Sequence, residues 1–179
     1  MRIVSGDFKG RVINVPLNFK LRPTTDIAKE SLFNILVNRF YFDELSVLDL
    51  FSGTGNITYE FLSRGAADIT SVELNPKHSA FIGKTCSELG GKRVQVIRAD
   101  AFVFTRTCSK QFDLIFADPP YDLKGIDEIP KNVIENKLLK PDGILILEHS
   151  PEIDFSHLQG FVERRKWGKV NMSFFGSIQ

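Results

Sequence analysis

The sequence predicts an α/β fold with a mostly parallel sheet that helices cover on both faces. From residue 46 onward, short apolar runs alternate with segments of helical periodicity. The runs are apolar at consecutive positions, which is typical of parallel strands buried on both faces. The last two expected strands are joined by a tight turn, so an antiparallel hairpin should complete a sheet of seven strands.

Residues 1–40 are expected to form an extension before a main domain at 41–179. The segment MRIVSGDFKGRVINVP alternates around a glycine-containing break, which favours a short hairpin. The segment LRPTTDIAKESLFNILVNRF predicts a helix that Thr24 or Thr25 can cap. The apolar face of this helix should contain Ile27, Leu32, Phe33, Ile35 and Leu36.

The main domain repeats a strand followed by a helix. Strands are expected at SVLDLF (46–51), DITSVEL (68–74), RVQVIRAD (93–100), FDLIFADPPY (112–121) and ILILEHS (144–150). Helices should run from the glycine-rich turn to about Ser63, from Pro76 to about Leu89 and around Ile129–Leu138, and a short helix or turn is expected through Ala101–Thr107. A turn at Pro141–Gly143 should precede the fifth strand, and the tail predicts two strands joined near Trp167 and Gly168.

The composition is that of an ordinary globular protein, with 42% hydrophobic and 25% charged residues. The N-terminus carries no apolar signal core and no run approaches membrane-spanning length, so we expect a cytoplasmic protein without a membrane partner. Cys86 and Cys108 form no CxxC motif, which argues against a zinc site or a disulfide framework. His78, His149 and His157 receive no role.

The strongest functional signals lie where the first three strands end, because ligands of such sheets bind beyond the carboxyl ends of the strands. The first strand leads into DLFSGTG (49–55), whose glycines allow a tight turn and close approach to a ligand. Glu73 ends the second strand, where an acid can accept hydrogen bonds from ribose hydroxyls. Asp100 ends the third, where a carboxylate can accept from an adenine amine.

Each of these residues taken alone is as often a structural turn residue or a solvated acid as a ligand-binding residue. Their occurrence at the ends of three successive strands nevertheless predicts an adenosyl-ligand site. A dinucleotide-dependent dehydrogenase would normally show a third glycine, and there is no GxxxxGK[ST] phosphate loop. The candidate ligand-binding residues are Asp49, Phe51, Gly53, Thr54, Gly55, Glu73, Leu74, Asp100 and Ala101.

The fourth strand ends in the tetrapeptide Asp118-Pro119-Pro120-Tyr121. Consecutive prolines fix φ and remove N–H donors, which leaves a stiff loop with outward carbonyls. A carboxylate beside such a carbonyl supplies two acceptors for the two hydrogens of an –NH₂ group. The aromatic ring of Tyr121 offers a flat face on which a base can stack, a role that needs the ring alone.

The combination of DLFSGTG, VEL, RAD and DPPY resembles the amino-methyltransferase class of S-adenosylmethionine enzymes. Within that class, MRIVSGDFKGR, LRPTTDIAKESLFNIL, SRGA at 63–66 and the WG turn at 167–168 resemble the RsmD family. The resemblance covers essentially the whole chain. The chain departs from the family at Asn56-Ile57-Thr58, where smaller residues are expected, and at the acidic stretch DEIP, residues 127–130.

The resemblance implies a Rossmann-like class I methyltransferase fold, and S-adenosylmethionine as cofactor with S-adenosylhomocysteine as product. It implies no metal, and a catalytic set of Asp118, Pro119, Pro120 and Tyr121. The implied reaction is methylation of the exocyclic N2 amine of a guanine in 16S ribosomal RNA. The implied partner is small-subunit ribosomal RNA or an assembling small ribosomal subunit, and we expect a monomer. Alternatives are an adenine-N6 nucleic-acid methyltransferase, a protein-glutamine methyltransferase, which prefers Asn before Pro-Pro, and a non-catalytic adenosyl-binding subunit.

The charge distribution supports a nucleic-acid partner only in part. The net charge is +1, but residues 1–40 hold 7 basic and 3 acidic side chains, and residues 160–179 hold 4 and 1. Basic ends on an acidic centre can form a phosphate-binding rim, although scattered Lys and Arg are also common on solvated surfaces. The candidate RNA contacts are Arg2, Lys9, Arg11, Arg22, Arg164, Arg165, Lys166 and Lys169.

Overall fold

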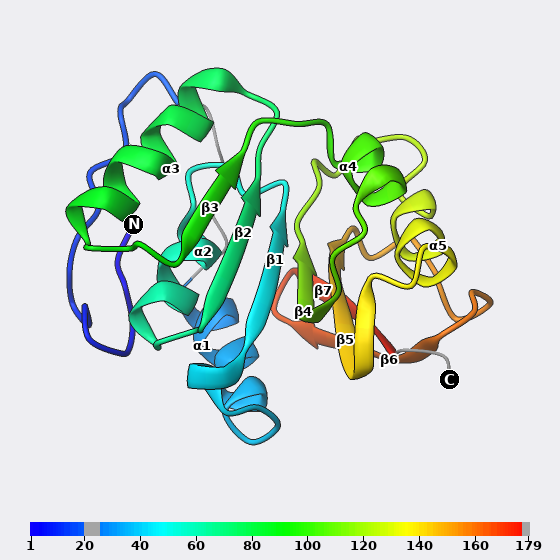
Figure 1. Ribbon diagram of the computed structural model, residues 1–179. Coiled ribbons are helices and arrows are strands. Elements are labelled where there is room, and N and C mark those ends of the chain that lie inside the picture. Colours follow the sequence, from blue (N-terminus) through cyan, green and yellow to red (C-terminus); the bar gives the residue numbers. More distant parts are fainter. Residues whose placement is uncertain (20–25, 177–179) are drawn as a thin grey trace.

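The computed structural model describes residues 1–19 and 26–176, and its centre is a seven-stranded sheet (Figure 1). The strand order is β3-β2-β1-β4-β5-β7-β6. Strands β1 to β5 run parallel to one another, whereas β7 runs antiparallel to both β5 and β6. This is the predicted Rossmann-like methyltransferase architecture with its closing hairpin, so the fold prediction is confirmed.

The elements lie close to their predicted positions. The strands are β1 (Ser46–Leu50), β2 (Asp68–Val72), β3 (Val94–Ile97), β4 (Phe112–Ala117), β5 (Leu139–His149), β6 (Phe161–Trp167) and β7 (Val170–Gly176). The helices are α1 (Asp26–Leu36), α2 (Asn56–Ser63), α3 (Pro76–Glu88), α4 (Ala101–Thr107) and α5 (Glu128–Glu135), with a 3-10 turn, η1, at Phe42–Glu44.

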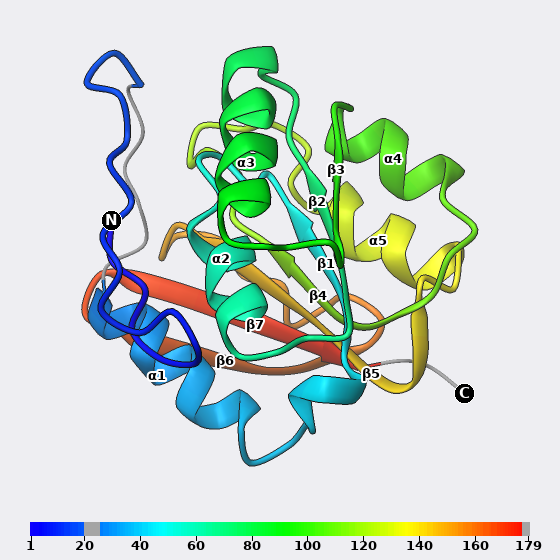
Figure 2. The same cartoon turned by 60° about the vertical axis from the view of Figure 1, so that its left-hand side comes forward.

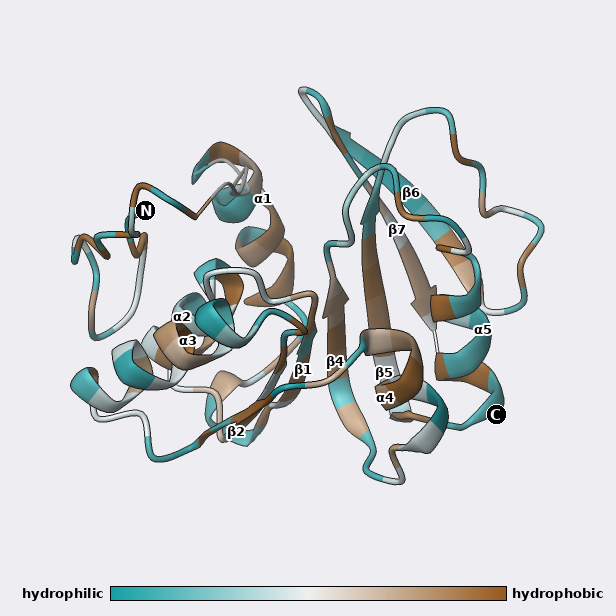
Figure 3. Ribbon diagram, turned by 90° about the horizontal axis from the view of Figure 1, so that it is seen from above, coloured by the Kyte–Doolittle hydropathy of each residue, from teal (hydrophilic) through white to brown (hydrophobic). Residues whose placement is uncertain are grey.

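Helices cover both faces of the sheet (Figure 2). On one face, α1, α2 and α3 pack against alternate strand residues such as Leu114 and Phe116. On the other face, α4 and α5 pack against the intervening residues, including Ile115 and Ala117. This alternation explains the continuous apolar runs, because both faces of each central strand are buried. Figure 3 shows β4 and β5 as largely hydrophobic strands, whereas α2, α3 and α5 also carry hydrophilic residues.

The fifth strand differs from the prediction, because it begins at Leu139 rather than at Ile144. Leu139 pairs with Phe112 and Ile144 with Leu114, so four residues of β5 bulge opposite a single residue of β4. The expected Pro141–Gly143 turn is therefore a bulge within the strand. Asp142 there has φ 61°, in the left-handed region that Asp tolerates better than most residues.

The first helix corrects another expectation. Ile27, expected on the apolar face, is 75% exposed, whereas Lys29 is fully buried. Leu32, Phe33 and Leu36 do face the core as predicted. The candidate caps Thr24 and Thr25, and the candidate RNA contact Arg22, lie outside the described residues.

Lys29 is buried because its ammonium group has three partners. Its Nζ donates to the Arg2 carbonyl (2.7 Å) and to Asn56 Oδ1 (2.9 Å), and it lies 3.3 Å from Glu60 Oε2. The Glu60 carboxylate in turn accepts the backbone N–H groups of Val4 and Ser5, both at 3.1 Å. This ion pair connects the N-terminal segment and α1 to α2. The hydrophobic periodicity of the sequence does not predict it.

The N-terminal segment has hairpin-like pairing, with an antiparallel bridge between Arg2 and Val12. Ile3 and Ile13 belong to the same hydrophobic cluster as α1 and α2. The division at residue 40 remains a prediction. No helix in the described ranges combines the length and apolar character needed to cross a bilayer.

Replacing Lys29 with Met should destabilise the protein by about 1–3 kcal/mol, because it removes one of the two cations that pair with the buried Glu60 carboxylate and leaves only Arg64, 3.1 Å from Oε1. Urea unfolding measures this change. The matched control is Lys84→Met, since the Lys84 side chain is 77% exposed; its effect should stay within about 0.5 kcal/mol. Equal stability of the two variants would contradict the assigned role of the buried ion pair.

Candidate active site

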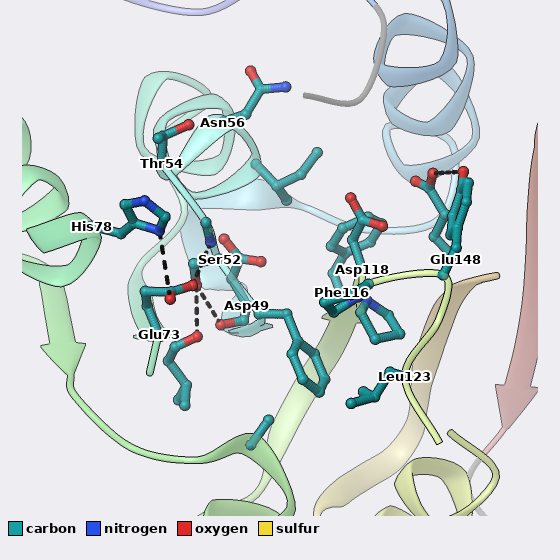
Figure 4. A pocket seen from close by; sticks show the side chains of 18 of the residues that line it. Asp49, Ser52, Thr54, Asn56, Glu73, His78, Phe116, Asp118, Leu123 and Glu148 are labelled. Carbon is teal, nitrogen blue, oxygen red and sulfur yellow. Dashed lines mark hydrogen bonds and ion pairs between the residues drawn. The ribbon is translucent and has the colours of Figure 1, made fainter. Parts of the chain in front are cut away.

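A pocket of about 1430 Å³ opens at the carboxyl edge of the sheet (Figure 4). Its lining residues include those that directly follow β1, β2, β3 and β4. The strand order reverses direction between β1 and β4, so this is the switch point at which ligands of open α/β sheets bind. Pockets for one small ligand typically measure about 300–1,000 Å³. The space therefore suits a cofactor together with part of a second substrate.

The glycine-rich turn after β1 forms one wall. Gly53 and Gly55 have φ of 56° and 86°, which L side chains rarely adopt. A Cβ on Gly55 would lie 2.6 Å from the Tyr59 ring, so glycine is required there for packing as well. Phe51 also has positive φ (57°), and its ring packs edge-on against Phe102 in the pocket lining.

Glu73 orders the turn as well as lining the pocket. Its carboxylate accepts the N–H of Gly53 (2.8 Å) and the N–H of Asn75 (2.7 Å). His78, which the sequence analysis left without a role, lies on α3 with Nδ1 3.7 Å from Glu73 Oε1. A carboxylate has about four acceptor positions, so Glu73 can still accept hydroxyl hydrogens of a bound ribose.

Asp49 lies beneath the turn and is 2% exposed. Its Oδ2 accepts a hydrogen bond from the Thr58 hydroxyl at 2.5 Å. Burial raises the pKa of Asp49 to about 7, although hydrogen bonds such as that from Thr58 oppose the shift. Thr58, one of the departures from the family pattern, is therefore in contact with a candidate cofactor residue.

Asp100 caps α4 with one oxygen, Oδ1, which accepts the N–H of Val103 at 3.0 Å. The cap fixes this acid at the end of β3, with capacity left at the other oxygen. Leu74 and Ala101 also line the pocket. Every cofactor candidate except Gly55 is among the lining residues, and Gly55 supports the turn next to them.

The tetrapeptide Asp118–Tyr121 lines the other half of the pocket. In the view of Figure 4, Asp118 lies between Glu148 and the two acidic residues beside the glycine-rich turn, Asp49 and Glu73. Tyr121 is 48% exposed, so its ring is accessible, and its hydroxyl donates to Glu148 Oε1 at 3.1 Å. This hydrogen bond gives the hydroxyl a function that the stacking hypothesis did not include.

Glu148 is the principal pocket residue that sequence reasoning missed. It lies in β5, is 3% exposed and lines the pocket. Burial raises the pKa of Glu148, and the hydrogen bond from Tyr121 opposes this effect. The available signal was an acidic residue after four consecutive apolar residues, ILIL, in a strand expected to be buried.

The basic candidates are distributed unevenly. Lys166, near the end of β6, and Lys169, in the β6–β7 turn, line the pocket. Arg164 instead donates to Asn171 Oδ1 (2.8 Å), and Arg165 pairs with Glu163 (2.7 Å). The other described candidates, Arg2, Lys9 and Arg11, are exposed on the N-terminal segment and are not part of the pocket lining. Within the described ranges, no cluster of three His, Cys, Asp or Glu side chains could hold a metal ion.

The raised pKa of Asp49 predicts a specific pH dependence of stability. Below about pH 4 the Asp49 carboxyl is protonated in both the native and the unfolded state. Between about pH 4 and 7 it ionises in the unfolded chain but stays neutral in the native protein. Native stability therefore falls through this window, by on the order of 4 kcal/mol. Asp49→Asn removes that loss, so its stability relative to the wild type should increase from pH 5 to pH 8 in urea unfolding. An equal difference at both pH values would refute the assignment.

Comparison with known proteins identifies the relatives of this chain. A family model described as conserved hypothetical protein 95 matches residues 1–176. YlbH of Bacillus subtilis, named as a candidate rRNA methyltransferase, is 34% identical over 164 residues, which are 89% of this chain and 88% of that protein. Ribosomal RNA small subunit methyltransferase D of Escherichia coli K12 is 32% identical over 85% of this chain and 76% of its own.

A solved structure agrees with these sequence matches. The Escherichia coli protein yhhF, described as a candidate methyltransferase, superposes with a TM-score of 0.86 at 27% identity. The superposition covers 99% of this chain and 97% of that one. The family model and the aligned relatives both span most of the chain, and the chain belongs to the RsmD family of methyltransferases.

Proposed function

We propose that this protein transfers a methyl group from S-adenosylmethionine to the exocyclic N2 amine of a guanine in 16S ribosomal RNA. The main support for this proposal is that Asp118 and the adjoining Pro119 line the same pocket as Asp49, Glu73 and Asp100. The first two residues can hold an amine, and the last three suit an adenosyl ligand.

The cofactor half of the pocket fits S-adenosylmethionine by its donor and acceptor groups. Glu73 can accept the ribose hydroxyls, and Asp100 can accept from the adenine amine. The buried Asp49 suits the ammonium group of the methionine part, because a cation would compensate a carboxylate that is costly to ionise there. When bound, S-adenosylmethionine supplies a methyl group on a positively charged sulfur, which is already a good leaving group.

The amine half must increase the nucleophilicity of a nitrogen whose lone pair is delocalised into the base. The Asp118 carboxylate and the Pro119 carbonyl can each accept one amine hydrogen. These hydrogen bonds favour the pyramidal nitrogen and strengthen as positive charge develops on it. They therefore stabilise the transition state more than the ground state.

Tyr121 can stack on the base once the base has left its own stack. Unstacking costs about a few kcal/mol, and less for an unpaired loop nucleotide. The half-exposed ring and the pocket volume of about 1430 Å³ allow both ligands to be present together.

Ribosomal RNA as substrate is supported by the names of the relatives and by the basic β6–β7 turn. Lys166 and Lys169 lie where phosphates flanking a base in the pocket would pass. Residues 1–40, as the predicted extension, would offer Arg2, Lys9 and Arg11 to more distant phosphates. We propose that a monomer acts on the RNA or on an assembling small subunit.

Two substitutions should separate chemistry from cofactor binding. Asp118→Ala should reduce methyl transfer by roughly 10²–10³-fold and leave cofactor affinity unchanged, because the proposed role of Asp118 is to hold the amine and not the cofactor. Glu73→Ala should weaken S-adenosylmethionine binding by roughly 10- to 100-fold, because it removes a charged acceptor. Mass spectrometry of methylated small-subunit RNA and calorimetry provide the two readouts. Normal turnover in Asp118→Ala, or methylation at a base other than guanine, would refute the proposal.

Charge reversal at the β6–β7 turn should weaken RNA binding. Lys166→Glu with Lys169→Glu should lower the affinity and reduce the salt slope by about one for each phosphate that the protein no longer neutralises. The control combines Lys84→Glu with Lys131→Glu, which makes the same charge change outside the pocket lining. Filter binding between low and moderate salt measures both. If the two double variants behave alike, the turn contributes only general charge.

A further inference from the structure

We propose that Glu148 selects guanine as the target base by accepting its N1–H, while Asp118 holds the adjacent exocyclic amine. The inference rests on the proposed function and deepens it, because it assigns a residue that distinguishes guanine from adenine. The sequence motifs of the pocket do not include Glu148.

The first observation is a buried acceptor without a donor. Glu148 Oε1 accepts the Tyr121 hydroxyl, whereas Oε2 is inaccessible and has no hydrogen-bond partner among residues 1–19 and 26–176. Buried polar atoms are nearly always satisfied, and an exception often marks a functional group. Because Glu148 lines the pocket, a rotation of its carboxylate would turn Oε2 towards the pocket, where a ligand can supply the missing donor.

The second observation is the register between β4 and β5. Ala117 pairs with Leu147 in the parallel ladder, so Asp118 and Glu148 follow on neighbouring strands at the same edge of the sheet. Figure 4 shows Asp118 and Glu148 on the same side of the pocket. A base stacked on Tyr121 with its amine at Asp118 would therefore present its next edge atom towards Glu148.

The two purines differ at that atom. Guanine carries an N1–H donor beside its 2-amine, whereas adenine carries an N1 acceptor beside its 6-amine. A carboxylate oxygen can accept from the first and would repel the second. Burial raises the pKa of Glu148, and a hydrogen bond from N1–H would favour its ionised form again. A site that hydrogen-bonds one substrate discriminates strongly against an analogue that leaves its buried group unpaired.

The test uses 2-aminopurine riboside, which keeps the 2-amine of guanosine but has an acceptor at N1. Both nucleosides are tested as competitors of methyl transfer to small ribosomal subunits from cells that lack the gene. Wild-type protein should be inhibited by guanosine at roughly 10- to 100-fold lower concentration, the ratio expected for one hydrogen bond to a charged group. In Glu148→Met, the ratio should fall to within about twofold while cofactor affinity by calorimetry is retained.

The matched control is Glu135→Met, since Glu135 is exposed on α5 and lies outside the pocket lining; it should keep the wild-type ratio. Equal inhibition of the wild type by both nucleosides would overturn the inference even if Glu148→Met fails to fold. An unchanged ratio in a folded Glu148→Met would do the same. Failure of the proposed function is recognised separately, because the wild type would then form no 2-methylguanosine in the subunits.

Discussion

The parallel pairing of β1 with β2 and β4 is the constraint on which the site depends. Parallel strands end at the same edge, so residues far apart in the chain meet there without a dedicated loop scaffold. The register Leu50 to Val72 and Leu50 to Ala117 brings the glycine turn, Glu73 and Asp118 to this edge. A slip of one residue would turn every side chain of a strand to the other face, and the fully buried strands resist such a slip.

The buried ionisable groups discussed above fall into two classes: those with an ion-pair partner within the protein, which are structural, and those without one among the described residues, which line the pocket. Lys29 and Glu60 are fully buried and pair with each other, with backbone groups and with the side chains of Asn56 and Arg64. Asp49 and Glu148 are also buried, yet neither forms an ion pair with any described residue, and burial raises the pKa of both. Because both carboxylates line the pocket, a bound ligand can supply the hydrogen-bond donors or the cation that the protein does not provide.

The fold and the residues that line the proposed cofactor half of the pocket could be predicted from the sequence because their signals are local. A short helix or turn was predicted at residues 101–107, the observed bounds of α4, and Glu73 and Asp100 were predicted to line the pocket because they follow apolar strands directly. Glu148 and Lys29 could not be predicted in the same way. Their function depends on partners distant in the chain, such as Tyr121 for Glu148 and Glu60 for Lys29, and single-strand periodicity contains no information on these contacts.

The closing hairpin explains why residues near the C-terminal end of the described chain line the pocket together with those that follow the parallel strands. Since β7 runs antiparallel to β5, its first residues lie beside the carboxyl end of β5, where Asn171 pairs with His149. The β6–β7 turn therefore lies at the ligand-binding edge, and Lys166 and Lys169 come to the pocket beside Glu148. A sixth parallel strand would place its preceding connection at the opposite edge of the sheet. The reversal of β7 thus allows one sheet edge to carry both the proposed cofactor half of the pocket, after β1–β3, and the proposed base half, after β4, in β5 and at the β6–β7 turn.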